Sequence, residues 1–247
     1  MFNNKSTIAP PPERDFKIKK GFTLAEVLIT LGIIGVVAAL TMPSFINNYQ
    51  KTVWTKQLQK SYATVQQGFK LMMAQEEVDS IDSTHAFQAL KTYGCARLDG
   101  ETMSNCTEFY NNLKKYFAIT YIDDTYGNKK SSAKIYLADG SYIFGYRFWG
   151  TSRGATNSEI KRFGDFWIDV NGDKKPNEKG RDRFYFIVSQ TGDVYAGGSK
   201  QSSLALYGDE TTMYWKTNVH YANHCYGKGF NNTTCAGRVL EKGKMDY

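Results

Sequence analysis

The amino-acid sequence predicts an α+β fold in which one long N-terminal helix packs on an antiparallel β-sheet. Residues 22–42 form an apolar run, and apolar residues continue after it at the spacing of an amphipathic helix. Beyond residue 77 the pattern changes to short alternating runs separated by turn residues, which is typical of antiparallel strands. The chain also holds 17 Tyr and 15 Phe, side chains that favour packed sheets.

The apolar run, FTLAEVLITLGIIGVVAALTM, carries one charged residue, Glu26. As a helix it spans about 31 Å, close to the thickness of the hydrocarbon core of a bilayer. The basic residues that precede it are expected to hold the leader on the cytoplasmic side: Lys17, Lys19 and Lys20. No A-x-A pattern follows the run, which argues against an ordinary signal peptide. An acid inside a membrane span is costly, so Glu26 indicates a function.

These residues resemble the prepilin motif of type IV pilins and type II secretion pseudopilins, through the stretch Lys19-Lys20-Gly21-Phe22-Thr23-Leu24-Ala25-Glu26. The resemblance implies that a prepilin peptidase cuts between Gly21 and Phe22 and methylates the new amine of Phe22. It makes Glu26 the fifth mature residue, where the family keeps a glutamate. It also places Pro43 where many members carry a helix-kinking proline. The resemblance covers residues 17 to about 50.

Glu26 lies near the start of the expected helix, where the helix dipole stabilises a negative charge by roughly a few tenths of a kcal/mol. This is far less than the cost of burying the carboxylate, so a cationic partner is needed. The freed amine of Phe22 on a neighbouring subunit is the natural candidate, and the resemblance implies the same pairing, which sets the register between subunits. The alternative is a carboxylate that only reaches the membrane interface.

Three regions follow from these patterns. Residues 1–21 are expected to be a leader that the peptidase removes. Residues 22–77 are expected to form one helix, with 22–45 in lipid or in a filament core and with a kink at Pro43. Residues 78–247 are expected to form a globular α+β domain outside the membrane. The apolar stripe of the second half of the helix consists of Val53, Leu58, Tyr62, Val65, Phe69, Met72 and Met73.

Short helices are predicted at residues 84–91 and 107–117. A hairpin is predicted over residues 133–148, where two alternating runs meet at Asp139-Gly140, a strong turn signal. Further strands are predicted at residues 162–170, 183–189 and 193–198.

The four cysteines fall as two close pairs, Cys95 with Cys106 and Cys225 with Cys235. Close pairs after an export-type segment predict disulfides, each stabilising the fold by about 2–3 kcal/mol. The second pair also resembles the C-terminal disulfide loop of many pilins. Four buried free thiols are the alternative. A zinc site is a further alternative for the second pair, because His220 and His224 stand next to Cys225.

One segment between two predicted strands has the pattern D-x-N-x-D, whose oxygen side chains suit calcium. Some pseudopilins hold calcium in a loop between late strands, so the resemblance supports the same expectation. The candidate ligands are Asp169, Asn171, Asp173, Asn177 and Asp182. An EF-hand would need Gly and Glu where this chain has Lys174 and Gly180. A metal-free turn is therefore the alternative, also because Asn-Gly-Asp is itself a good turn former.

Of the formal charge of +7, +3 lies in the first 21 residues and the remaining +4 is spread over the other 226, so no specific nucleic-acid partner is predicted. No catalytic constellation is present, so the sequence does not predict an enzyme. The resemblance implies a structural subunit of a pilus or a secretion pseudopilus. It would be anchored by one span in the bacterial inner membrane, with its soluble domain outside. The implied partners are a prepilin peptidase, other pilin-type subunits, an inner-membrane assembly platform and, before assembly, membrane lipid.

The alternative is a minor or tip subunit whose domain binds DNA, a surface or an exported substrate. Subunits of a type IV pilus, a type II secretion apparatus and a DNA-uptake filament share the same kind of N-terminal segment. The sequence therefore does not distinguish among these three systems.

Overall fold

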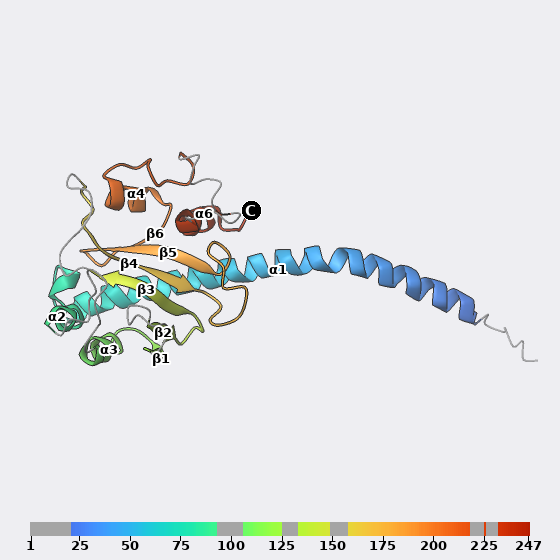
Figure 1. The fold of residues 1–247 in the computed structure, drawn as a ribbon, viewed down its shortest axis with the longest axis horizontal. Helices are drawn as coiled ribbons and strands as arrows, with labels where there is room; N and C mark the ends of the chain where they lie inside the picture. Colours follow the sequence, from blue (N-terminus) through green and yellow to red (C-terminus); the bar gives the residue numbers. More distant parts are fainter. Residues whose placement is uncertain (1–20, 93–105, 125–132, 149–157, 218–224, 226–231) are drawn as a thin grey trace, which may run out of the picture. The chain divides into compact units, whose positions relative to one another are not determined.

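The computed structural model describes residues 21–92, 106–124, 133–148, 158–217, 225 and 232–247 (Figure 1). The chain divides into two compact units, Met1–Ile46 and Asn47–Tyr247, and each is described by itself. Helix α1 (Leu24–Gln75) contributes to both units. The expected helix is therefore present, two residues shorter at each end than predicted.

In the first unit, α1 continues through Pro43. Proline has no backbone N–H, so the carbonyl of Ala39 loses its usual helical partner. Two residues before Pro43, the hydroxyl of Thr41 donates to the carbonyl of Val37 at 2.9 Å. The kink at Pro43 stays a prediction.

In the second unit, α1 buries most of the stripe that the sequence predicts, together with Trp54 and small or polar neighbours, while Val53 is only half-buried. The buried residues are Trp54, Thr55, Leu58, Ser61, Val65, Gly68, Phe69, Met72 and Met73. Tyr62 lies at the margin, half-buried against the core. The amphipathic pattern is therefore confirmed, and its apolar side faces a sheet.

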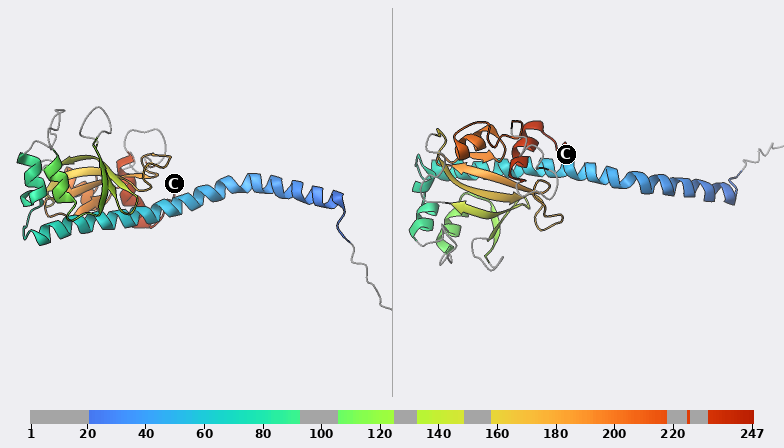
Figure 2. Two further views of the ribbon diagram at one scale, coloured as in Figure 1. Left: turned by 90° about the horizontal axis from the view of Figure 1, so that it is seen from below. Right: turned by 45° about the horizontal axis from the view of Figure 1, so that its top comes forward.

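Within the described residues the sheet has six antiparallel strands, and their order in space follows their order in the chain. The strands are β1 (Ile119–Asp123), β2 (Lys134–Leu137), β3 (Tyr142–Phe148), β4 (Arg162–Asp169), β5 (Arg183–Ser189) and β6 (Val194–Ala196). Figure 2 shows this sheet lying along the second half of α1, with α2 (His85–Thr92) and α3 (Thr107–Leu113) at one end. The α+β fold class is confirmed, and so is the hairpin, whose turn places Gly140 at φ 88°.

Alternation along the strands gives the sheet two different faces. On β5, Phe184, Phe186 and Val188 enter the main core with α1. Tyr185 and Ile187 point to the other face, where they pack with residues of α4 (Lys200–Tyr207) and its neighbourhood. Helix α6 (Cys235–Lys242) follows the short helix η3 (Asn232–Thr234) and contacts β5 and β6.

Helix α1 also protects one edge of the sheet. The hydroxyl of Tyr62 donates to the carbonyl of Val194 at 3.0 Å, and Gln66 Oε1 accepts the N–H of Val194 at 2.7 Å. These bonds satisfy backbone groups of β6 that would otherwise be available to another strand.

Several elements differ from the sequence prediction. The helix predicted over residues 107–117 is wrong at its end, because α3 stops at Leu113. Turn bonds follow instead, and they carry Phe117 into the core, where its ring meets Phe69 edge-on at 5.0 Å. Strand β1 and helices α4 and α6 were not predicted.

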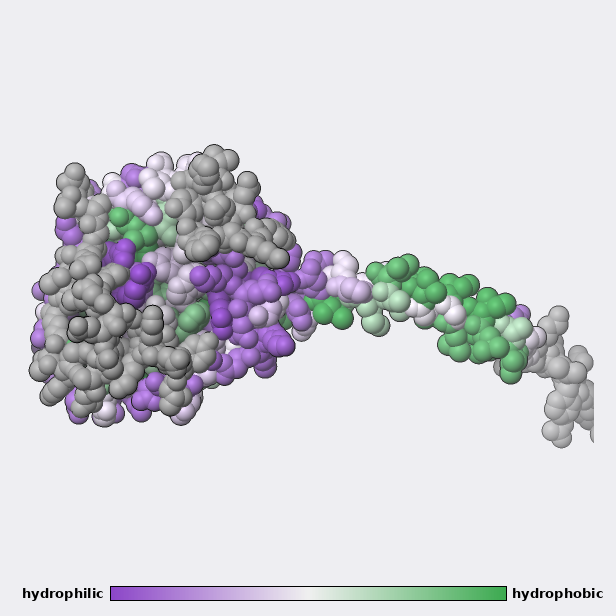
Figure 3. Space-filling model, viewed as in Figure 1, coloured by the Kyte–Doolittle hydropathy of each residue, from purple (hydrophilic) through white to green (hydrophobic). Residues whose placement is uncertain are grey.

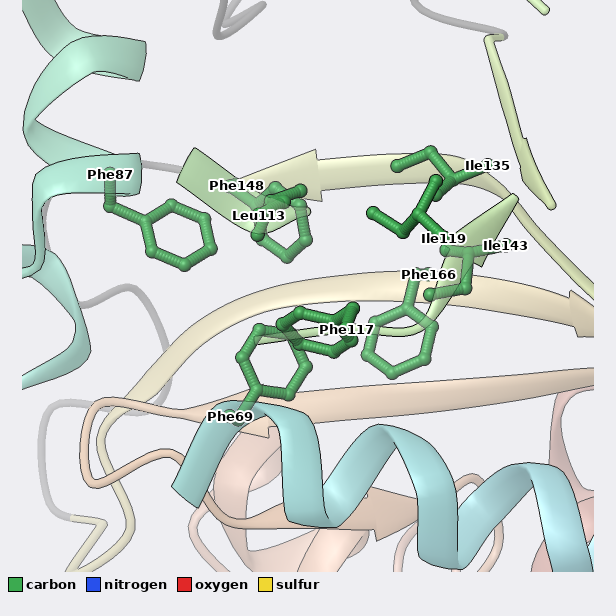
Figure 4. Close-up of a pocket in the computed structure, with 9 residues that line it drawn as sticks. All are labelled: Phe69, Phe87, Leu113, Phe117, Ile119, Ile135, Ile143, Phe148 and Phe166. Carbon is green, nitrogen blue, oxygen red and sulfur yellow. The ribbon is translucent and has the colours of Figure 1, made fainter. Parts of the chain in front are cut away.

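The core contains a small apolar cavity of about 20 Å³ (Figure 4). It is lined by Phe69, Phe87, Leu113, Phe117, Ile119, Ile135, Ile143, Phe148 and Phe166. The volume is about that of one water molecule, but no polar side chain lines the space to bind one. The cavity therefore indicates slight underpacking rather than a ligand site.

Gly68 allows α1 to approach Phe117 closely, because an added Cβ would lie 2.4 Å from the ring. We expect Gly68→Val to destabilise the fold by about 1–3 kcal/mol through overpacking. For a domain of this size the melting temperature would fall by about 2–4 °C for each kcal/mol. Thermal unfolding of the full chain in detergent measures this change. Gln67→Val is the matched control, because the neighbouring side chain is exposed. Equal shifts in the two variants would contradict the packing role of Gly68.

Candidate functional site

The start of α1 is held by reciprocal hydrogen bonds between Thr23 and Glu26. The backbone N–H and the hydroxyl of Thr23 both donate to Glu26 Oε2, each at 2.8 Å. The backbone N–H of Glu26 donates back to Thr23 Oγ1 at 3.2 Å. This is a capping box, which satisfies N–H groups that have no partner inside the helix.

The capping box leaves the second carboxylate oxygen of Glu26 available. Both bonds from Thr23 fall on Oε2, so Oε1 accepts neither of them. The sequence reasoning missed the role of Thr23, although the spacing T-x-x-E is the known signature of a capping box. Glu26 is thus fixed in position by its own helix, and among the described residues its Oε1 accepts no bond from Thr23.

The predicted cleavage junction lies just before the capping box. Gly21 is exposed, nothing lies within 4 Å of a Cβ built on it, and Phe22 is 90% exposed. No contact within the described chain requires glycine at position 21. A requirement for glycine there would come from a partner that the backbone must approach closely.

The first unit exposes a continuous apolar surface. Its large apolar side chains between residues 22 and 46 are 43–90% exposed, and Figure 3 shows them in green along the helix. Among the described residues, α1 is the one helix long and apolar enough to cross a membrane. An apolar surface of this extent needs a partner, which lipid or other protein supplies.

Residues 16–42 match the family model described as the prokaryotic N-terminal methylation motif. The chain carries a prepilin-type N-terminus. This motif is the hallmark of type IV pilin and pseudopilin precursors, and it confirms the resemblance found around the Gly21–Phe22 junction. It implies processing by a prepilin peptidase and assembly with other pilin-type subunits, and with the apolar helix it indicates membrane anchoring. No solved structure matches the chain.

The disulfide predicted between Cys225 and Cys235 is confirmed. Its two Cα atoms are 5.3 Å apart, and both cysteines are buried. It lies against Gly180, where an added Cβ would meet Cys235 Sγ at 3.0 Å. Of the other predicted pair, Cys106 is described but Cys95 lies outside the described residues. The zinc alternative rests on His220 and His224, which also lie outside them.

The predicted calcium ligands lie in and beside the loop 170–182, which connects β4 to β5, but their side chains face different partners. Asp169 ends β4 and is fully buried; its Oδ2 accepts from Arg183 Nε at 2.8 Å. Asp173 is exposed; it pairs with Lys134 and accepts from the hydroxyl of Tyr136 at 2.7 Å.

Asp182 is also fully buried, and its carboxylate closes the loop from inside. It accepts the backbone N–H groups of Asn177 at 2.7 Å and Glu178 at 2.6 Å. Asn171 Nδ2 donates to the same carboxylate at 3.2 Å. Asn177 adopts a positive φ of 57°, a conformation that asparagine tolerates better than most residues.

The electrostatic environments of these carboxylates differ. Burial raises the pKa of Asp169 to about 6, and the hydrogen bond from Arg183 opposes this rise. Burial also raises the pKa of Asp182, against the opposing effect of the loop N–H groups. The hydrogen bond from Lys134, with that from Tyr136, lowers the pKa of Asp173. The loop is therefore not one uniform acidic cluster.

These contacts test how well the loop suits calcium. Each of the three aspartates faces a donor of the protein itself, and the described residues contain no group of three or more His, Cys, Asp or Glu placed to hold a metal. Calcium favours several oxygens that converge on one point. The described geometry fits calcium poorly, and calcium binding stays a prediction.

The unconstrained environment of Gly21 leads to a prediction about processing. We expect Gly21→Leu to leave the full-length precursor in the membrane, because a bulky side chain would obstruct the approach of the backbone to the peptidase. The mass of the membrane-extracted protein measures cleavage. Gly32→Leu is the control, since an added Cβ there also meets nothing within 4 Å. Mature protein of normal mass from Gly21→Leu would refute the predicted junction.

Proposed function

We propose that the chain is a structural subunit of a pilus-like or secretion-type pseudopilus filament. A prepilin peptidase would process it between Gly21 and Phe22, and it would assemble through the first half of α1. The observation that carries this proposal is the match of residues 16–42 to the methylation motif. The exposed apolar surface that begins at the same residues supports it, because a filament core would cover that surface.

The geometry of the helix start supports a specific role for Glu26. Before assembly, the capping box holds its carboxylate at the first turn of α1. Removing residues 1–21 would create a positively charged amine on Phe22. Within an apolar assembly, the Phe22 amine of one subunit would pair with Glu26 of the next, because an unpaired buried charge is strongly unfavourable. This pairing would set the axial register of the filament.

The proposed location follows from the same segment. Before assembly, α1 would cross the inner membrane once and place residues 78–247 on the outer side, with the basic leader in the cytoplasm. An inner-membrane platform would then add the subunit to the filament. The motif points to a structural family rather than to an enzyme, and we infer a structural role.

A second candidate is a minor subunit that also binds a ligand. An open pocket of about 540 Å³ beside β6 favours it, since small-molecule sites commonly have this size. Three tyrosines, Tyr62, Tyr195 and Tyr214, contribute to its lining. The abundance of the chain in sheared filaments distinguishes the candidates, because a major subunit would dominate and a minor subunit would be sparse.

Two substitutions separate the charge of Glu26 from its capping role. Glu26→Gln keeps a side chain that can complete a capping box but removes the charge. We expect it to reduce filament yield by about tenfold or more while leaving cleavage intact, because one buried charge pair is lost. Filament mass per cell, measured in sheared fractions, checks this.

The matched variant is Thr23→Val, which removes the hydroxyl of the capping box but keeps the charge of Glu26. We expect it to assemble far better than Glu26→Gln. Unchanged filament yield in Glu26→Gln would rule out the charge pairing. Equal losses in the two variants would show that the cap, rather than the charge, matters for assembly.

A further inference from the structure

The loop between β4 and β5 closes around a guanidinium. Arg183 Nε donates to Asp169 Oδ2 at 2.8 Å. Its Nη2 donates to the hydroxyl of Tyr142 at 2.8 Å and to Asn177 Oδ1 at 3.0 Å. The guanidinium also lies 5.0 Å from the ring centroid of Phe144, which supports it from the side. One arginine thus joins the end of β4, strand β3 and the middle of the loop.

Backbone pairing explains why Arg183 reaches this position. Asp169 and Arg183 are direct cross-strand partners in the β4–β5 register, and Tyr142 is the partner of Asp169 on β3. All three side chains therefore point to the same face of the sheet. Asp169 is fully buried, and a buried carboxylate needs a cation or several donors. Arg183 supplies the cation and one donor, and the hydroxyl of Tyr142 donates to the same Oδ2 at 3.1 Å.

We infer that the guanidinium of Arg183 is the resident cation of this loop and holds it closed without calcium. Two of the five oxygen residues expected to bind calcium, Asp169 and Asn177, are joined by this one side chain. A divalent ion at the same oxygens would lie next to a fixed positive charge. The planar guanidinium, with several donors in fixed directions, suits such bridging, and a lysine would not replace it.

Two of the remaining candidate ligands, Asp182 and Asp173, agree with a loop closed by protein groups, whereas Asn171 Oδ1 is buried and has no hydrogen-bond partner among the described residues. Asp182 binds the N–H groups of the loop, which donate to a carboxylate and would repel a metal ion. Asp173 is held by Lys134 and Tyr136 on β2. The loop also carries three lysines, Lys174, Lys175 and Lys179, whose charges oppose the binding of a further cation.

Thermal unfolding of the full chain in detergent tests this inference, with and without millimolar calcium after treatment with a chelator. We expect the wild-type melting temperature to be the same in both conditions. Arg183→Met should lower it by about 10 °C, because the buried carboxylate of Asp169 loses the cation that contacts it. Arg181→Met is the matched control: Arg181 belongs to the same loop, but its side chain is 44% exposed and pairs with exposed Glu178. This control should shift the melting temperature by about 2 °C or less.

A double variant keeps the test decisive where Arg183→Met alone does not fold. Asp169→Asn combined with Arg183→Met removes the buried charge together with its counter-ion, and it should recover at least half of the loss. A calcium-dependent rise in the wild-type melting temperature would overturn the inference. A loss in Arg183→Met no larger than in Arg181→Met would overturn it as well, and so would a double variant no more stable than Arg183→Met.

Discussion

An apolar helix surface is stable only where something other than water covers it, and this constraint governs the N-terminal unit. Within the described residues, the large side chains of residues 22–46 remain mostly exposed. Lipid would cover them before assembly, and neighbouring helices would cover them in a filament. In either environment a charge is costly unless it is paired. The apolar surface and the single carboxylate of Glu26 therefore need the same partner, one that offers both apolar contact and a positive charge.

The capping box gives a second reason why Thr23 and Glu26 stand directly after the proposed cleavage junction. Thr23 and Glu26 start α1 by themselves, so the helix can begin directly after the proposed new N-terminus. Cleavage at Gly21 would place the Phe22 amine one residue before the cap. A positive amine at a helix start is unfavourable next to the helix dipole, which adds to the need for a nearby carboxylate. The same glutamate thus fits the local stability of the helix and the proposed contact between subunits.

Local patterns predicted the parts of the fold whose signals lie close together in the sequence. The stripe with Leu58, Val65 and Phe69 showed helical spacing, and Asp139-Gly140 marked a hairpin, so α1, β2 and β3 were predictable. Strand β1 was not, because it is short, partly exposed and interrupted by an irregularity between Ile119 and Tyr121. Helix α4 was missed because it buries the small residues Ser202, Ser203 and Ala205 rather than a large apolar stripe, and α6 was missed because it contains Gly237, a poor helix former. The end of α3 depends on Phe117 reaching the core, which is a tertiary effect.

The β4–β5 loop shows why the candidate site was harder to predict than the helix. The pattern D-x-N-x-D suits calcium or a tight turn equally well, since both use the same short oxygen side chains. The inference that separates them rests on Arg183, fourteen residues after Asp169, which meets it only because the two strands pair in one register. A cross-strand arginine in that register brings a permanent positive charge to the oxygens that a metal would need. The choice between metal and turn therefore depends on strand pairing, which the loop sequence alone does not contain.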